Sequence, residues 1–162
     1  GQLNAILASN IVLNDQPLAG SRLIKRNEGV NLVFLAYLHP NAFRYSAKEN
    51  IPLFNEDKFK LHYNKVVGQG ILIVLFHGDE EDLNTFIENY RAVDLVLLAH
   101  TQRTGVLSEA KPIVVGGGLD GEFLMQIDIG STPNGEPEFS VEPIPIGLEI
   151  EPDKQINKLI GD

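Results

Sequence analysis

The sequence predicts an α/β fold built around a parallel sheet, and three consecutive segments carry this prediction. Residues 71–76 and 94–99 are apolar runs of strand length, typical of strands buried on both faces of a sheet. Residues 80–90, between them, place apolar side chains at helical spacing on one face. A strand, a helix and a strand in this order form a βαβ unit, in which the two strands lie parallel. The apolar face of the helix consists of Leu83, Phe86, Ile87 and Tyr90.

The segment before this unit is expected to contribute further strands and a helix. Residues 6–13 predict a short strand, and the turn-forming sequence of residues 14–17 ends it. Residues 21–26 and 30–38 predict a hairpin. Its second arm is continuously apolar from residue 32, as expected for a strand that is buried on both faces. Residues 58–67 predict a short helix.

The segment after the unit predicts two more strands, at residues 112–115 and 123–129, with Asp120 and Gly121 forming the turn before the second. Five prolines follow between residues 130 and 153, which indicates a stretch that connects elements or lies against a surface. Residues 153–160 predict a short amphipathic turn of helix.

Composition excludes several classes of function. The chain has 162 residues, 43% of them hydrophobic, and can bury the core of one ordinary domain. No run of eighteen apolar residues occurs, which excludes a membrane-spanning helix, and residues 1–10 show no signal peptide. The absence of cysteine excludes disulfides, thiolate metal sites and a cysteine nucleophile. The net charge of −9 argues against a protein that binds nucleic acid.

Two histidines are the candidate site residues. His77 and His100 each follow a buried strand of the βαβ unit. Ligands of open α/β sheets bind in the crevice outside the carboxyl ends of the strands, so the two imidazoles are expected to converge there, as metal ligation requires. Gln102 could reach the same point with its carbonyl oxygen. The alternative is that both histidines begin loops and are held by hydrogen bonds, because two imidazoles and one amide make an incomplete ligand shell.

Other polar residues have simpler interpretations. The acidic residues 79–82 lie in the first turn of the predicted helix, where the helix dipole favours negative charge, and Asp79 is expected to cap that helix. His39 and His62 are isolated in the sequence, and a structural role is predicted for His39. His39 ends the strand at residue 38, however, and could border the same crevice as His77.

A glycine-rich segment, residues 116–121, matches the pattern G-x-G-x-x-G. A dinucleotide site needs a helix after this pattern, so that the helix N-terminus meets the pyrophosphate. The residues that follow alternate as a strand instead. We therefore interpret the segment either as a plain tight turn or as a loop that permits close approach to a site.

Taken in order, five segments resemble motifs of the calcineurin-like metallophosphoesterases, in their 5′-nucleotidase branch. Leu75-Phe76-His77-Gly78 is similar to the (S/T)-H-x-G segment of that family. Leu98-Ala99-His100-Thr101-Gln102 is similar to the G-G-H-(S/T)-(H/Q) segment, with Ala99 in place of the usual glycine. The other similar segments are residues 7–11, 28–38 and 112–128. Residues 148–158 resemble the linker helix that leads to the nucleotidase C-terminal domain.

The resemblance implies an α/β fold that forms part of a four-layer α/β/β/α sandwich with a mixed sheet. Residues 1–130 would be the C-terminal half of the catalytic domain, and residues 131–162 a proline-rich tail and linker helix. The resemblance also implies two divalent metal ions, with His77 and His100 as ligands of one ion and Gln102 of the other. Zinc, manganese, magnesium and calcium are not distinguished. The isolated chain is expected to bind one ion weakly or none.

The D-x-H, G-D-x-x-D and G-N-H-(E/D) motifs of the family would lie before Leu3 and are absent from this sequence. In the family they supply the bridging aspartate, most other metal ligands and the histidine that protonates the leaving group, so no catalytic or substrate-binding residue is assigned to this chain. We expect a fragment or subunit of a metal-dependent phosphoric ester hydrolase, similar to 5′-nucleotidases and inactive without those motifs. Its intact form would act on a phosphate ester or nucleotide, in the periplasm or outside the cell.

A protein partner is also expected. Continuous apolar strands such as residues 71–76 need cover on both faces, and helices can cover only one of them. We expect the other face to bind a complementing chain or to drive self-association into a homo-oligomer. The alternative function is a non-catalytic binding or interaction module derived from the same fold.

Overall fold

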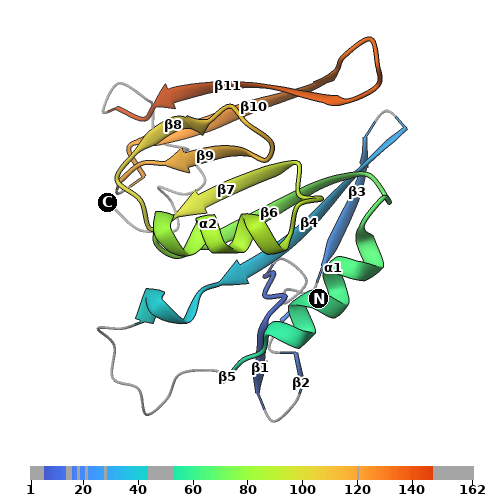
Figure 1. Ribbon diagram of the computed structural model, residues 1–162. Helices are drawn as coiled ribbons and strands as arrows, with labels where there is room; N and C mark the ends of the chain where they lie inside the picture. The colour runs from blue at the N-terminus through green and yellow to red at the C-terminus, as the bar shows by residue number, and fades with distance from the viewer. Residues whose placement is uncertain are drawn as a thin grey trace, which may run out of the picture.

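A mixed six-stranded sheet forms the centre of the protein (Figure 1). The computed structural model describes residues 6–13, 16–17, 19–20, 22–27, 29–43, 53–119 and 121–147. Strands β4, β6, β7 and β9 are parallel, and the edge strands β3 and β8 run antiparallel to their neighbours. This arrangement confirms the predicted α/β class with a mixed sheet. In spatial order the strands are β3 (Leu23–Asn27), β4 (Val30–Leu38), β6 (Ile71–His77), β7 (Leu95–Ala99), β9 (Ile113–Gly117) and β8 (Thr104–Ser108).

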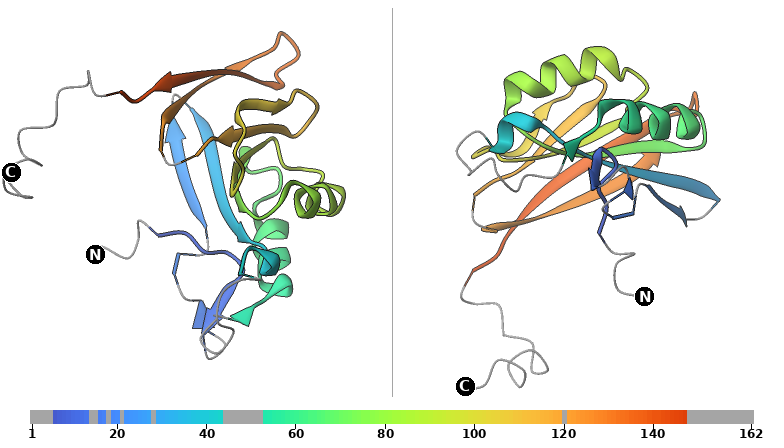
Figure 2. Two further views of the ribbon diagram at one scale, coloured as in Figure 1. Left: turned by 90° about the vertical axis from the view of Figure 1, so that its left-hand side faces the viewer. Right: turned by 90° about the horizontal axis from the view of Figure 1, so that it is seen from below.

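Two helices cover one face of this sheet (Figure 2). Helix α1 (Glu56–Val66) precedes β6, and α2 (Glu80–Asn89) joins β6 to β7, so each belongs to a crossover between parallel strands. The Asn55 side chain caps α1 by accepting a hydrogen bond from the Lys58 N–H at 2.9 Å. The sequence predicts both helices, and it predicts every strand of this sheet except β8. Neither α-helix in the described residues is long and apolar enough to cross a membrane.

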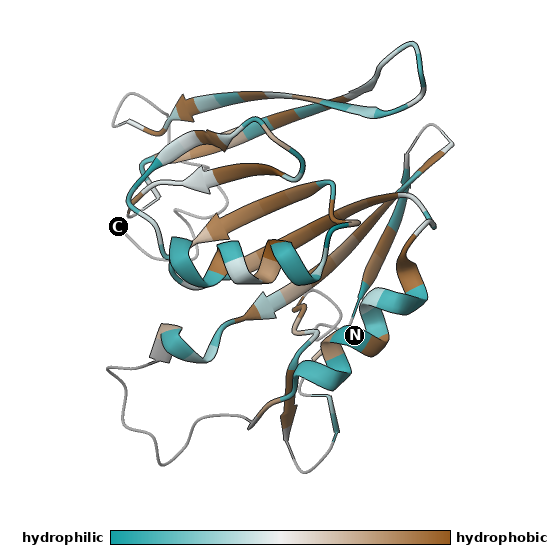
Figure 3. Cartoon of the chain, viewed as in Figure 1, coloured by the Kyte–Doolittle hydropathy of each residue, from teal (hydrophilic) through white to brown (hydrophobic). Residues whose placement is uncertain are grey.

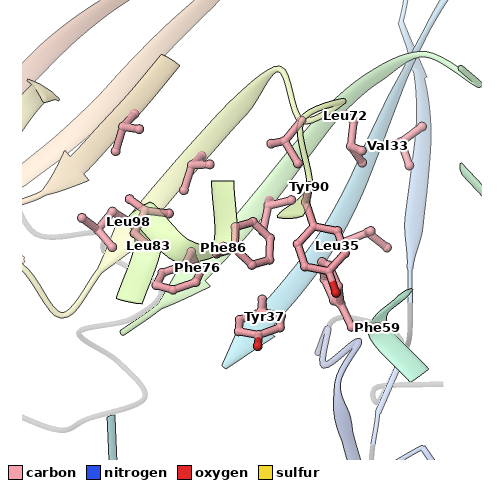
Figure 4. Packing of buried hydrophobic residues seen from close by; sticks show 14 of the residues in the cluster. Val33, Leu35, Tyr37, Phe59, Leu72, Phe76, Leu83, Phe86, Tyr90 and Leu98 are labelled. Atoms are coloured by element: carbon pink, nitrogen blue, oxygen red, sulfur yellow. The ribbon is translucent and has the colours of Figure 1, made fainter. Parts of the chain in front are cut away.

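The face that the helices cover holds the main hydrophobic core (Figure 4). Phe59 of α1 is fully buried, and Phe86 of α2 is 4% exposed. The rings of Tyr37 and Phe76 stack between neighbouring strands, with their centroids 5.5 Å apart. Burying one such side chain stabilises the fold by roughly 1.5–3 kcal/mol. The strands contribute alternate residues to this core: Val33, Leu35 and Tyr37 from β4, Leu72, Val74 and Phe76 from β6, and Val96 and Leu98 from β7.

A hairpin of β10 (Phe123–Ser131) and β11 (Pro137–Pro145) lies against the opposite face of the sheet (Figure 2). Figure 3 shows hydrophobic sheet strands and a hairpin in which hydrophobic and hydrophilic residues alternate. The hairpin covers Ile73, Leu95 and Val115, which form a second, smaller core. Its own contribution to this core consists of Met125, Ile127, Ile129, Phe139 and Val141.

The proline-rich stretch after residue 131 contains a strand, β11, that the sequence does not predict. It contains Pro137, Pro143 and Pro145, and β10 is its partner on one side. An edge strand tolerates proline because its outer N–H groups have no ladder partner to lose. The turn of helix expected at residues 153–160 lies outside the described residues. The division of the chain at residue 130 stays a prediction.

The N-terminal segment closes the edge of β4 by an unexpected route. Of the strand expected at residues 6–13, only β1 (Ile11–Leu13) is a strand; it pairs with β2 (Gln16–Pro17) and β5 (Leu53–Phe54). Just before β1, the Ser9 N–H donates to the Ala36 carbonyl at 3.0 Å, and the Ser9 hydroxyl accepts from the Ala36 N–H at 2.9 Å. The Asn10 side chain accepts from the Leu38 N–H at 3.0 Å and donates to the Leu38 carbonyl at 2.8 Å. The Ser9 backbone N–H and two side chains therefore replace a strand at this edge.

Glu56, in the first turn of α1, links three elements through two tyrosines. The Tyr37 hydroxyl of β4 donates to Glu56 Oε2 at 2.5 Å, and the Tyr90 hydroxyl, just after α2, donates to Glu56 Oε1. Burial raises the pKa of both tyrosines above their ordinary value, and the hydrogen bond and negative charge of Glu56 raise it further. Both phenols therefore keep their protons in the folded state at alkaline pH.

This linkage predicts a loss of stability above about pH 10. The unfolded chain loses its phenolic protons near pH 10 while the folded state keeps those of Tyr37 and Tyr90, so the free energy of unfolding falls as the pH rises. Urea denaturation is expected to show a loss of about 1 kcal/mol per tyrosine between pH 8 and pH 11. Tyr90→Phe should remove about half of that loss. The Tyr63 hydroxyl accepts a hydrogen bond from the Ala92 N–H and does not contact Glu56 in any described bond. Tyr63→Phe should therefore lose as much stability between pH 8 and pH 11 as the parent does. An equal slope in Tyr90→Phe and the parent would show that the pKa of Tyr90 is not raised in the folded state.

Candidate metal centre

His77 and His100 lie side by side at the carboxyl edge of the sheet. His77 ends β6 and is in register with Ala99, the last residue of β7, and His100 follows Ala99 directly. The centroids of the two imidazole rings are 5.2 Å apart. The parallel topology therefore brings the two histidines together, as the sequence predicts. Their role as metal ligands stays a prediction.

The surroundings of this pair favour a neutral imidazole at His77. Burial lowers the pKa of His77, and the positive charge that His100 can carry lowers it further. A neutral imidazole has a free ring nitrogen, which is the form that binds metals. Asp79 Oδ1 lies 3.9 Å from His100 Nε2, so a carboxylate borders the pair.

Asp79 corrects one sequence expectation. It stands at the N-cap of α2, but its side chain makes no capping hydrogen bond. Only its backbone carbonyl takes part in the helix, by accepting from the Leu83 N–H at 3.0 Å. The carboxylate instead lies near His100, on the side of the candidate site.

His100 has a left-handed backbone, with φ of 69°. Among the described residues it is the one residue other than glycine with a positive φ. This conformation costs roughly 1–2 kcal/mol in a residue with a Cβ atom, and such strain gathers at functional sites. A glycine would relieve the strain, but it would also remove the imidazole.

Gln102 lies in the exposed loop between β7 and β8. No described hydrogen bond or ion pair joins it to either imidazole, and its role as a ligand stays a prediction. The loop is tied to α2 by Glu80, which accepts from Thr101 at 3.2 Å and from Arg103 at 2.9 Å. Among the described residues, no three histidine, aspartate or glutamate side chains gather closely enough to hold an ion. The donors present fit a divalent ion in kind, but they do not complete its shell.

The glycine-rich segment supports the loop that carries His100. A Cβ atom at Gly116 would lie 2.4 Å from the Arg103 carbonyl oxygen, so the loop backbone packs directly on this glycine. The Gly118 N–H donates to the same carbonyl at 3.1 Å, and Gly118 has a φ of 75°. The strand β10 follows, as predicted, which leaves no helix N-terminus for a dinucleotide. The end of the segment is also a tight turn, since the Glu122 N–H donates to the Leu119 carbonyl at 3.0 Å and Gly121 has a φ of 73°. The turn interpretation is therefore supported, and approach of the loop to a site stays a prediction.

An apolar cavity of about 510 Å³ adjoins His77 on the sheet face opposite the helices. The hairpin does not fully cover this half of the face, and Leu75 is 37% exposed there. The strands that are apolar on both faces predict such a sheet face, which is apolar and incompletely covered. The cavity lining includes Leu38, Leu75, His77, Leu97, Met125 and Ile127.

The two remaining histidines have different surroundings. His39 is not isolated: its Nδ1 lies 2.9 Å from Asp82 Oδ2 of α2, at the edge that also carries His77. The order of the strands could have indicated this pair, because β4 lies beside β6 and α2 starts just after β6. His62 lies on α1, where burial lowers its pKa and the positive charges of Lys65, Arg22 and Lys58 lower it further.

Comparison with known proteins supports the fold. No family model and no curated protein matches the sequence. The Thermus thermophilus sulfate thiohydrolase SoxB superposes with a TM-score of 0.78 at 22% identity over 94% of this chain and 30% of its own. A putative 5′-nucleotidase from Staphylococcus aureus gives 0.76 at 15% identity over 94% and 35%. This chain thus spans about a third of the length of these structures. The likeness confirms, at the level of the fold, the resemblance to the calcineurin-like metallophosphoesterases.

The strain at His100 predicts opposite effects of two substitutions on stability. His100→Gly relieves the left-handed backbone and should raise the free energy of unfolding by about 0.5–1 kcal/mol, once the greater freedom of glycine in the unfolded chain is subtracted. His100→Ala removes the same imidazole but keeps the strain, so its stability should stay near that of the parent. Urea denaturation of the three proteins checks this. Equal stability of the glycine and alanine variants would show that position 100 is not strained.

Proposed function

We propose that this chain, which has part of the metallophosphoesterase fold, contributes to the metal site of a phosphoric ester hydrolase and is inactive without the rest of that enzyme. The observation that carries the proposal is the pair His77 and His100 at the carboxyl edge of the sheet, 5.2 Å apart by ring centroids. The fold likeness to a putative 5′-nucleotidase supports a phosphate ester or nucleotide as substrate of the intact enzyme. On the same ground, we propose that the enzyme acts in the periplasm or outside the cell.

In this proposal His77 and His100 bind one divalent ion, and Gln102 contributes to a second. Divalent ions in such sites polarise a phosphoryl oxygen and lower the pKa of a bound water. The lowered pKa of His77 keeps its imidazole neutral near pH 7, and the Asp79 carboxylate, 3.9 Å from His100 Nε2, adds negative charge beside the pair. The other ligands and the groups that act on the substrate would come from the metal motifs that this sequence lacks.

The same proposal assigns the apolar cavity to a complementing polypeptide that carries those motifs. The cavity borders His77, so a polypeptide that covers it would also stand beside the metal site. Exposed side chains such as Leu75 give this surface a hydrophobic driving force for association.

A second candidate function is a non-catalytic binding module. The observation in its favour is that the described residues include no group of three histidine, aspartate or glutamate side chains placed to hold an ion. Metal binding by the isolated chain separates the two candidates.

We expect the isolated chain to bind one Zn²⁺ or Mn²⁺ weakly, through His77 and His100. Isothermal titration calorimetry should show that His77→Ala and His100→Ala each weaken the affinity at least about tenfold, since each removes half of the imidazole donors. His62→Ala, which removes a histidine from α1, should bind as the parent does. Equal affinities in all four proteins would favour the binding module.

We also expect the isolated chain to self-associate through the surface around Leu75 when no complementing polypeptide covers it. Sedimentation velocity should show oligomers for the parent, and Leu75→Asp should shift them towards the monomer because a carboxylate opposes burial in an apolar contact. Leu61→Asp is the matched control, since Leu61 is 46% exposed on α1. A parent that sediments as a monodisperse monomer would contradict this expectation.

A further inference from the structure

We propose that His39, held by Asp82, is a positioning residue that fixes the backbone of His77 and Gly78 and so sets the direction of the His77 imidazole. The inference rests on the proposed metal-binding role of His77. His39 follows β4, and its ring lies on the side of the sheet that carries α2, where it meets Asp82.

His39 contacts the segment that carries His77 in two ways. Its backbone N–H donates to the His77 carbonyl at 2.8 Å, which continues the β4–β6 ladder past the pair of Leu38 and His77. A Cβ atom at Gly78 would lie 2.8 Å from the His39 Cβ. The two residues are therefore packed so closely that a displacement of His39 must displace Gly78, and with it the end of β6.

Asp82 in turn fixes His39. Asp82 Oδ2 is buried and lies 2.9 Å from His39 Nδ1, and the Asn41 side chain donates to Oδ1 at 2.9 Å. No other described group donates to Oδ2, so this oxygen is paired when His39 Nδ1 carries the proton. The Asn41 backbone N–H donates to the same nitrogen at 3.3 Å when Nδ1 is unprotonated, so a proton on Nδ1 exchanges this longer bond for the 2.9 Å contact with the buried carboxylate. Asp82 thus selects the tautomer and fixes the ring plane of His39.

These contacts form a closed circuit. The chain runs from His77 through Gly78 into the first turn of α2, where Asp82 binds His39, and His39 binds back to His77. A pair that served stability alone would leave the metal affinity of the folded protein unchanged. A pair that positions His77 should change that affinity even in variants that remain fully folded.

The test compares the full chain with His39→Ala, Asp82→Ala and Asp82→Asn, at a temperature where circular dichroism shows all of them folded. Titration with Co²⁺, followed by its visible spectrum, should give an affinity about tenfold weaker for the two alanine variants, with an altered spectrum. Asp82→Asn keeps an oxygen acceptor and should recover part of the loss. Glu81→Gln, exposed in the same helical turn, is the control and should bind as the parent does. If His39→Ala does not fold, Asn41→Ala takes its place, because it removes the hydrogen bond to Asp82 Oδ1 and leaves His39 and Asp82 themselves intact.

A second readout needs no metal. The amide signals of His77 and Gly78 in ¹H–¹⁵N spectra should shift in the alanine variants, and the His39 amide should exchange faster with solvent. A folded Asp82→Ala variant with the parent's Co²⁺ affinity and unchanged His77 and Gly78 signals overturns the proposal. If the parent itself binds no Co²⁺, the proposed function fails, and the amide signals alone decide: shifted signals support the positioning role, and unchanged signals overturn it.

Discussion

The parallel strands carry apolar side chains on both faces, and both faces must be removed from water for the sheet to be stable. The strand order β4, β6 and β7 follows the chain in one direction, so crossovers of one hand place α1 and α2 on the same face. The other face is left to the β10–β11 hairpin, which covers Ile73 and Leu95 but leaves a cavity beside His77. Because the hairpin covers this second face only in part, an apolar surface stays uncovered next to the two imidazoles.

The elements that sequence could predict are those whose pattern reflects their own burial. The continuous apolar run of β6 and the helical spacing of α2 are set by the core that they face, so the βαβ unit follows from local pattern. The strands that escaped prediction lie at edges. β8 contains Gly105 and packs on one side, and β11 contains three prolines that an edge position tolerates. The pairing of Ser9 and Asn10 with β4 depends on side-chain contacts across more than 25 residues, which no local pattern records.

The candidate site also has one part that the sequence predicts and another that it does not. The adjacency of His77 and His100 follows from topology alone, because the carboxyl ends of neighbouring parallel strands share an edge. The left-handed backbone of His100 and the contact of His39 with Asp82 depend on the loops beyond the strands, where small changes in dihedral angle move a side chain by several ångströms. The position of Gln102 depends on how the β7–β8 loop is tied to Glu80, and that tie involves residues 21 and 23 positions apart in the chain.

The side chain of Asn10 has a further consequence for assembly. A carboxamide is a chemical copy of a peptide group, and here it occupies both the donor and the acceptor of Leu38. Ser9 occupies the two groups of Ala36, with its backbone N–H on the carbonyl and its hydroxyl on the N–H. The backbone groups of Ala36 and Leu38, in the stretch of β4 that β3 leaves unpaired, are therefore both occupied on that side. A second polypeptide therefore cannot extend the sheet by strand addition beside the histidines. A protein that approaches the sheet along this edge of β4 must therefore pack on a face of the sheet, with side chains rather than main chain making the contact.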